Sequence, residues 1–343
     1  MLAKIKTWSI NAAIMLLSLL LFSVFIEGCV RGLQFLEVLP KLTEDSVSIS
    51  GPALKKHNAK LIKSKNTVLA LEYDKTDPAI NSVGMRDREY TVDFSSDVSR
   101  VAVMGDSISF GLGVALEDSY AKQLESLLNA AGDRPKKYEV MNFGISGYST
   151  ESELEWFRVA AEQFAPDLVV VGYVMNDPIP TSALFGAVAE AMRKAREFGK
   201  LAEKSQVVAW VKMNWDRATT ALNVMNNYEP FYDVEGEQWQ GVVAAFSEFK
   251  RLSVDQDFQL LVVVFPMLFN FDDYPFAPHK SQVLAMLEDV GIEYIDLLPA
   301  YSRAHRAEDF RILSDDATHP NELGHRIAAQ EIDLFLRNSG WLH

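Results

Sequence analysis

The sequence predicts an α/β protein built on one doubly wound, flavodoxin-like parallel sheet with helices on both faces. Two observations predict this fold. Short apolar runs rich in valine lead toward turns marked by Gly, Asn or Pro, at residues 101–104, 138–143, 168–171 and 260–265. Amphipathic helical segments alternate with these runs, at residues 120–130, 152–164 and 237–252, and one more lies near the C-terminus. Apolar runs of this length are typical of buried parallel strands, and their alternation with helices indicates βαβ units.

Composition excludes several classes of protein. The 343 residues are 48% hydrophobic, which is enough for a packed core and excludes general disorder. The formal charge of -14, from 47 acidic and 33 basic side chains, argues against nucleic acid as the main partner. A lone cysteine, Cys29, cannot form an intramolecular disulfide or a Cys-rich metal site. The sequence therefore predicts a globular acidic protein that depends on no disulfide.

The N-terminus carries an apolar run flanked by charge. Lys4 and Lys6 precede residues 8–26, nineteen residues without a charged side chain. As a helix with a rise of about 1.5 Å per residue, this run is roughly 28 Å long, close to the hydrocarbon thickness of about 30 Å. We therefore predict an N-terminal transmembrane anchor within residues 1–30. The two lysines favour a cytoplasmic N-terminus and an extracytoplasmic remainder.

Two other processing routes remain open at this segment. A cleaved signal peptide needs small residues before the cut, and residues 24–28 offer no clean site. The stretch before Cys29 faintly resembles a bacterial lipoprotein box, but Glu27 is poorly suited to that position. An uncleaved anchor is the preferred interpretation.

The rest of the chain divides into two predicted regions. Residues 31–98 show no sustained period and are expected to form a stalk and edge segment. Residues 99–340 form the predicted α/β domain, with a helical insertion at 181–235. The insertion is interpreted as an extra helical layer over the sheet, with a cap over the substrate entrance or a membrane or partner surface as alternatives.

Three turns at predicted strand ends carry polar groups suited to catalysis. Open α/β sheets bind ligands at the carboxyl ends of their strands. Ser107 follows the first predicted strand, Gly147 lies in the turn after the second, and Asn176 lies in the turn after the third. A serine hydroxyl, backbone N–H groups and an amide side chain together make a nucleophile and an oxyanion hole. Each turn taken alone is also compatible with an ordinary loop.

A fourth motif supplies an acid and a base. Asp316 lies three residues before His319 in a loop that precedes the C-terminal amphipathic helix. At this spacing the carboxylate can bind Nδ1 and leave Nε2 free to accept the serine proton. His325 is interpreted as a helix-packing residue. The remaining histidines lack a nearby motif: His57, His279, His305 and His343.

These four motifs, in this order, resemble the SGNH, or GDSL, hydrolases. The resemblance implies that Ser107 is the nucleophile, His319 the base and Asp316 its orienting acid. It also implies an oxyanion hole formed by the Ser107 amide, Gly147 and Asn176. No metal or organic cofactor is implied. The third block departs from the family pattern, because Val174 stands where a Gly two residues before the Asn is usual.

A further segment, residues 81–89, resembles the stretch before the first strand in membrane-anchored bacterial members. Several of those members act on acylated envelope sugars, while an ordinary polar turn is the simpler interpretation. We therefore expect a membrane-anchored serine esterase that hydrolyses a short-chain or acetyl O-acyl ester, with an acylated envelope glycan as the candidate substrate. The alternatives are an O-acyltransferase with the same triad and a noncatalytic envelope binding protein.

Overall fold

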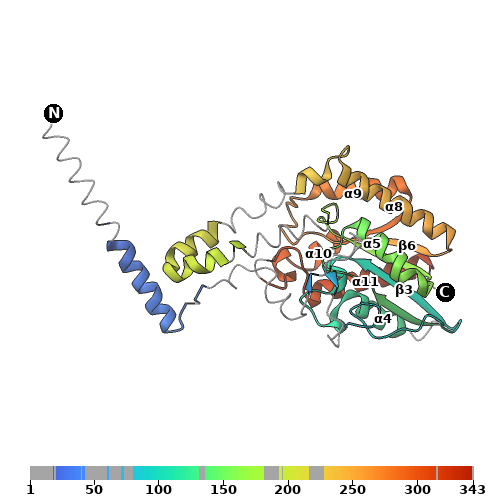
Figure 1. The fold of residues 1–343 in the computed structure, drawn as a ribbon, viewed down its shortest axis with the longest axis horizontal. Coiled ribbons are helices and arrows are strands. Elements are labelled where there is room, and N and C mark those ends of the chain that lie inside the picture. Colours follow the sequence, from blue (N-terminus) through green and yellow to red (C-terminus); the bar gives the residue numbers. More distant parts are fainter. Residues whose placement is uncertain are drawn as a thin grey trace. The chain divides into compact units, whose positions relative to one another are not determined.

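The computed structural model describes residues 18, 21–39, 41–42, 60–61, 71–72, 80–130, 136–180, 193–194, 196–215, 228–313 and 316–341. They belong to two compact units (Figure 1). One unit, here the N-terminal unit, comprises Met1–Gly51 and Ala189–Thr220. The other, here the sheet unit, comprises Pro52–Val188 and Ala221–His343. The boundaries that we predicted at residues 30 and 98 and for the insertion stay predictions.

Five parallel strands form the sheet of the sheet unit, in the order β4-β3-β5-β6-β7. Their bounds are Val98–Gly105 for β3, Lys137–Asn142 for β4, Leu168–Tyr173 for β5, Gln259–Val264 for β6 and Glu293–Asp296 for β7. The predicted parallel α/β sheet is thus confirmed, and four strands fall on the predicted apolar runs. The edge strand β7 was not predicted, because its four residues are only partly buried or exposed and form no apolar run. A separate antiparallel pair joins β1 (Lys60–Leu61) and β2 (Leu71–Glu72).

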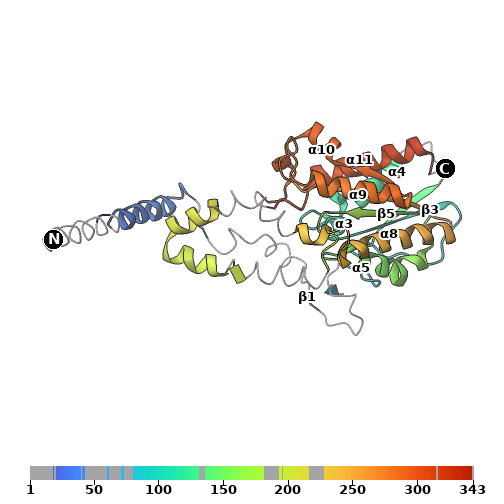
Figure 2. The same ribbon diagram turned by 90° about the horizontal axis from the view of Figure 1, so that it is seen from above.

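Helices cover both faces of the sheet (Figure 2). On one face α4 packs beside α11, and on the other α5 packs beside α8, which also contacts α9. The bounds are Tyr120–Ala130 for α4, Thr150–Trp156 for α5, Glu237–Asp255 for α8, Ala277–Val290 for α9, Leu298–Ala304 for α10 and Glu322–Ser339 for α11. The short helices are α3 (Ser107–Phe110), η2 (Leu116–Asp118), η5 (Glu229–Tyr232) and η6 (Ala307–Phe310).

Local sequence signals explain most helix ends, and two helices differ from the prediction. The predicted helix at 152–164 is α5 followed by a π-helical stretch, Phe157–Ala161, and a 3-10 turn, Glu162–Phe164. The Ser149 side chain caps α5 by accepting the N–H of Ser152. Helix α9 was not predicted, although a proline in its first turn and Gly291 after its last residue mark its ends.

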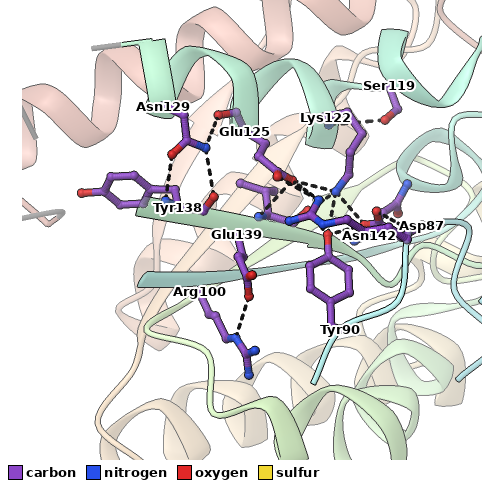
Figure 3. A network of polar contacts seen from close by, with 12 residues as sticks. Asp87, Tyr90, Arg100, Ser119, Lys122, Glu125, Asn129, Tyr138, Glu139 and Asn142 are labelled. Atoms are coloured by element: carbon purple, nitrogen blue, oxygen red, sulfur yellow. Dashed lines mark hydrogen bonds and ion pairs between the residues drawn. The ribbon is translucent and has the colours of Figure 1, made fainter. Parts of the chain in front are cut away.

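Residues 81–90, which we call the strap, are anchored in the sheet unit rather than forming a free polar turn. The Asn81 carboxamide oxygen accepts three successive backbone N–H groups, from residues 83–85. The buried carboxylate of Asp87 forms an ion pair of 2.7 Å with Lys122 of α4 and accepts the N–H of Asn142 at the end of β4. Figure 3 shows Lys122 at the centre of this network, with the hydroxyl of Tyr90 also bound to its ammonium. The strap is therefore held to both α4 and β4.

In the N-terminal unit, residues 21–35, 196–204 and 206–215 are helical. Glu27 caps the last of these helices: its carboxylate accepts the backbone N–H groups of Gln206 and Val207 and the hydroxyl of Ser205. Burial favours a raised carboxyl pKa, but these hydrogen bonds and Arg31 outweigh it and lower the pKa of Glu27 to about 2. A small apolar cluster of Phe198, Ala202, Ala209 and Met213 packs the helices together.

In the described part of the chain, no helix has the length and the apolar character needed to cross a membrane. Of the predicted span at 8–26, residues 8–17 and 19–20 lie outside the described residues. The transmembrane anchor stays a prediction.

Candidate active site

The candidate nucleophile lies where strand β3 passes into a short helix. Ser107 is the first residue of α3, and Asp106 caps this helix by accepting the N–H of Ile108 at 2.9 Å. Strands β4 and β5 flank β3, so the turns that follow all three strands come together at one edge of the sheet. Only 7% of the surface of Ser107 is exposed. The serine is thus fixed at the carboxyl edge of the sheet, as the sequence predicts.

The structure brings the three predicted triad residues together across 212 positions of sequence. Ser107 Oγ lies 2.8 Å from His319 Nε2, and His319 Nδ1 lies 2.8 Å from Asp316 Oδ2. The other carboxylate oxygen of Asp316 accepts the backbone N–H groups of Thr318 and His319, at 2.9 and 3.0 Å. One carboxylate therefore orients the imidazole and shapes its loop. The neighbouring Asp315 lies outside the described residues.

The loop that carries His319 is fastened to the sheet unit by hydrogen bonds. The N–H of Leu268, beyond the end of β6, donates to the carbonyl of Ala317. The guanidinium of Arg311 in turn donates to the carbonyl of Leu268. Ile312 donates its N–H to the carbonyl of His319 at 3.2 Å. The loop is held on both sides, so the imidazole needs little ordering before reaction.

Electrostatics prepares the histidine to act as a base. Burial by itself lowers the pKa of His319, but the Asp316 carboxylate outweighs burial, and the pKa lies above the ordinary value of 6.5. Burial alone likewise raises the pKa of Asp316, whereas His319 and the backbone N–H groups lower it, and the pKa lies below its ordinary value. Asp316 is consequently ionised at neutral pH, and His319 gains a proton readily when the serine is activated.

The predicted oxyanion donors come from the turns beside β3. The Nδ2 group of Asn176, after β5, donates one hydrogen bond to Asp106 at 3.0 Å. An amide NH₂ has two hydrogens, so the second is available to a substrate. Gly147, after β4, has a φ of 82°, a conformation that costs other residues about 1–2 kcal/mol. Val174, where the family pattern usually has glycine, directly follows β5 and is fully buried.

Two neighbours of the site are structural. A Cβ atom on Gly144 would lie 2.2 Å from the backbone nitrogen of Phe110, so this glycine lets the turn after β4 lie against α3. The buried hydroxyl of Ser109 lies 3.1 Å from the carbonyl of Met104 and 2.6 Å from the hydroxyl of Tyr120. Ser109 is thereby engaged in the core and is a poor competitor to Ser107 as nucleophile.

Arg86 of the strap is a residue that sequence reasoning missed. Its buried guanidinium donates to the carbonyls of Phe110, Gly111 and Val114 at 3.0, 2.7 and 2.8 Å. These carbonyls terminate and follow α3, the helix that begins with Ser107. The resemblance at residues 81–89 was the available signal, but the contact between Arg86 and α3 requires the tertiary structure.

Two buried acids behind the site were missed as well. Glu153 of α5 and Asp177, next to Asn176, are fully buried. Burial raises the pKa of both carboxyl groups well above the ordinary values. Repulsion from Asp106 raises the pKa of Glu153 further, and repulsion from Glu153 and Asp106 raises that of Asp177 further. Both groups are therefore favoured in the protonated form near neutral pH.

The other histidines divide as follows. His325 is buried, accepts the N–H of Tyr120 at Nδ1 and stacks on the Tyr120 ring, so its predicted packing role is confirmed. Burial, and then the charges of Arg86 and His319, lower its pKa to about 3. His279 lies 2.9 Å from the carboxylate of Glu229, and His305 contacts a phenylalanine ring. His57 and His343 lie outside the described residues.

Residues 103–327 match the GDSL-like Lipase/Acylhydrolase family. The chain belongs to this family. The match covers more than half of the chain and includes Ser107, Gly147, Asn176, Asp316 and His319. The protein is accordingly a carboxylic ester hydrolase of the GDSL type. A comparison with curated protein sequences found no match.

Solved structures of esterases are similar at low identity. An acetyl xylan esterase shares 17% identity with a TM-score of 0.44, over 69% of this chain and 99% of that chain. An acetylxylan esterase from Geobacillus stearothermophilus shares 17% with a TM-score of 0.45, over 73% and 99%. A two-domain esterase active on acetylated mannans shares 14% with a TM-score of 0.43, over 70% and 49%, so this chain spans about half of its length. The family assignment rests on the sequence match.

Proposed function

We propose that this GDSL-type hydrolase cleaves a short O-acyl ester through Ser107, His319 and Asp316. The observation that carries the proposal is the continuous chain of two 2.8 Å contacts from Ser107 through His319 to Asp316. It is the arrangement by which a serine hydroxyl loses its proton to an imidazole whose tautomer is held by a carboxylate.

In the first half-reaction, Ser107 Oγ attacks the ester carbonyl carbon while His319 Nε2 takes the hydroxyl proton. The carbonyl electron pair moves to oxygen, and the resulting oxyanion is stabilised by the Ser107 N–H, the Gly147 N–H and the Asn176 amide. When the oxyanion collapses, the C–O bond to the alcohol breaks, and the alcohol leaves with the proton from His319. Loss of a single donor of this kind typically costs about 10²–10³ in rate.

In the second half-reaction, water attacks the acyl group on Ser107 and gives its proton to His319. Collapse of the second tetrahedral intermediate releases the carboxylic acid and returns the proton to Ser107. Because His319 must begin each half-reaction neutral, activity rises with pH through the pKa of His319, which lies above 6.5.

A short acyl group, with an acylated envelope glycan as the alcohol side, is the substrate that we propose. The low exposure of Ser107 supports a small acyl group, because a long chain needs an open apolar path to the nucleophile. The strongly acidic composition argues against an anionic polymer as the alcohol side. Hydrolysis is preferred over transfer because water at about 55 M competes with any weakly bound acceptor.

We also propose that the N-terminal anchor is retained in the mature protein. Glu27 caps the helix at 206–215, so a cut directly after residue 27 or 28 would remove that cap from the N-terminal unit. A lipidated Cys29 would require the cut after residue 28, whereas a signal-peptide cut after residue 26 would leave Glu27 in the mature chain. The capping contact thus argues against the lipidated form, and the lack of a clean cleavage site at 24–28 argues against a signal peptide. Lys4 and Lys6 before the span favour a catalytic domain outside the cytoplasm.

The test uses a fluorophosphonate probe and a panel of acetyl to long-chain esters and acetylated glycans. Ser107→Ala should abolish labelling and ester cleavage, whereas the control Ser109→Ala, if folded, should still be labelled. Labelling that persists in folded Ser107→Ala would contradict the assignment, and a wild-type protein that never labels would support a noncatalytic binding protein. Mass spectrometry of the products then separates the reactions: free acid indicates hydrolysis, and predominant acylated acceptor at millimolar acceptor indicates a transferase.

A further inference from the structure

The N-terminal unit differs in charge from the rest of the chain. Residues 1–51 and 189–220 carry eleven Lys and Arg side chains against eight Asp and Glu, a net charge of +3. Lys4 and Lys6 precede the predicted span, so the part of the unit after the span carries +1. Since the whole chain carries -14, the sheet unit carries -17. A nearly neutral unit in an otherwise acidic protein can approach an anionic surface that the sheet unit would repel.

Part of the unit's positive charge surrounds a hollow. The hollow has a volume of about 600 Å³, and its lining includes one acidic residue, Glu203, and four cationic ones: Arg31, Lys41, Arg196 and Lys200. Arg31 is partly engaged, because it pairs with Glu27 and donates to the carbonyl of Glu203. Lys41, Arg196 and Lys200 are exposed. Guanidinium and ammonium groups converging on a hollow of this size match the charge and hydrogen-bonding needs of a phosphate group.

The same unit exposes large apolar side chains. On the helix at 206–215, one face packs inward through Ala209 and Met213, while Val208, Val211 and Trp215 are exposed. Trp215 is 70% exposed, and Phe35 at the end of the first helix is 87% exposed. Trp and Phe interleaved with Lys and Arg are typical of segments that lie at the interface of a membrane.

We propose that the N-terminal unit lies on the membrane surface and binds anionic phospholipid head groups in this basic hollow. Lys41, Arg196 and Lys200 contact lipid phosphates, and Val211 and Trp215 enter the interfacial layer. The proposal rests on the proposed anchor: the described helix at 21–35 overlaps the end of the apolar run at 8–26, so the residues that follow the span lie within reach of the membrane surface. Charge complementarity selects an anionic bilayer over a neutral one.

The experiment measures whether the exposed helix face is immersed in lipid. The full chain is reconstituted into vesicles of phosphatidylcholine alone or mixed with phosphatidylglycerol. In a Cys29→Ser background, which removes the lone cysteine, a nitroxide label is attached through Val211→Cys. A matched control carries the label through Val254→Cys, on an exposed position of α8 in the sheet unit. The spin relaxation of the nitroxide is measured with a water-soluble nickel complex and with oxygen. A label immersed in lipid is shielded from the nickel complex and accessible to oxygen.

The label at position 211 should be protected from nickel and accessible to oxygen in the anionic vesicles only, while the label at 254 stays accessible to nickel. Combining Arg196→Glu with Lys200→Glu, or raising the salt to about 0.5 M where the Debye length is about 4 Å, should abolish the protection. Each basic side chain near an anionic surface favours binding about fivefold, so loss of two predicts at least about a 25-fold weaker preference for the anionic surface.

Other outcomes overturn the proposal in distinguishable ways. If the chain floats with vesicles after alkaline extraction but position 211 stays accessible to nickel, the surface proposal is wrong and the anchor stands. Equal protection in neutral vesicles excludes anionic lipid as the occupant. If the label at position 211 is protected from nickel in detergent, and the protection increases with protein concentration, the helix face is covered by a second copy of the chain. A chain that does not float with either vesicle overturns the anchor itself.

Discussion

Replacing Asp316 with asparagine tests the triad with little disturbance of its loop. The carboxylate has two separate tasks, since Oδ1 accepts two backbone N–H groups and Oδ2 binds His319 Nδ1. An asparagine can keep its carbonyl oxygen on the backbone and place its NH₂ toward the imidazole. Because an NH₂ group donates, it forces Nδ1 to accept and puts the proton on Nε2, where it faces Ser107. The histidine then starts in the wrong tautomer.

The expected loss is large and has a signature in pH. In serine hydrolases generally, tautomer loss of this kind costs about 10⁴ in rate, equivalent to about 5.5 kcal/mol of transition-state stabilisation. Removing the carboxylate also removes the main influence that raises the pKa of His319, and burial then lowers that pKa. Residual activity should therefore persist to lower pH than in the wild type. The assay is the pH dependence of kcat and kcat/KM with a chromogenic acetyl ester.

The control is Asp315→Asn, which removes the same charge one residue away and should lose far less activity. Thermal unfolding of both variants checks that the loop still folds. Equal losses in the two variants, or a loss in Asp316→Asn below about tenfold with an unchanged acid limb, would refute the role of Asp316 as the orienting acid.

Three further predictions concern residues around the triad. Arg86→Lys should lower kcat about tenfold with little change in KM in steady-state kinetics, because one ammonium cannot reach the three carbonyls at the end of α3 and beyond it. The control is Arg88→Lys, at an exposed position of the strap. An equal loss of kcat in the control would contradict the role of Arg86 in holding α3. Gly147→Ala should destabilise the protein by about 1–2 kcal/mol in urea unfolding and reduce kcat at least tenfold, since φ is 82°; wild-type stability would show that the turn adapts. Between pH 6.5 and about 3 the imidazole of His325 is protonated in the unfolded chain but neutral in the folded chain, so the stability of the wild type falls as pH falls, by at most about 1.4 kcal/mol per pH unit. His325→Gln should remove this contribution to the pH dependence of stability. Identical slopes of stability against pH in urea unfolding of the two proteins would refute the buried neutral imidazole.

The sequence by itself determined the elements whose signals are local. Four strands of the sheet contain short, mostly apolar runs, and a run of this kind needs no knowledge of its neighbours to be recognised. Asp316 and His319 lie in one loop, so their three-residue spacing already places the carboxylate beside the imidazole. Ser107 directly follows the first predicted strand, and polar residues after parallel strands share one edge of the sheet by topology alone.

Only the tertiary structure decided the features that depend on contacts between distant segments. Edge strand β7 has a mixed composition because it is only partly buried, so no periodicity marks it. In the sequence nothing distinguishes Arg86 from other arginines in polar stretches, or Glu153 from other acids in helices. Only the fold places Arg86 against α3 and buries Glu153. Glu27 likewise is an ordinary acid after an apolar run, and it becomes a helix cap only when residues 206–215 fold beside it. Periodicity encodes which element forms, whereas burial and partners are set by long-range packing that a local pattern does not contain.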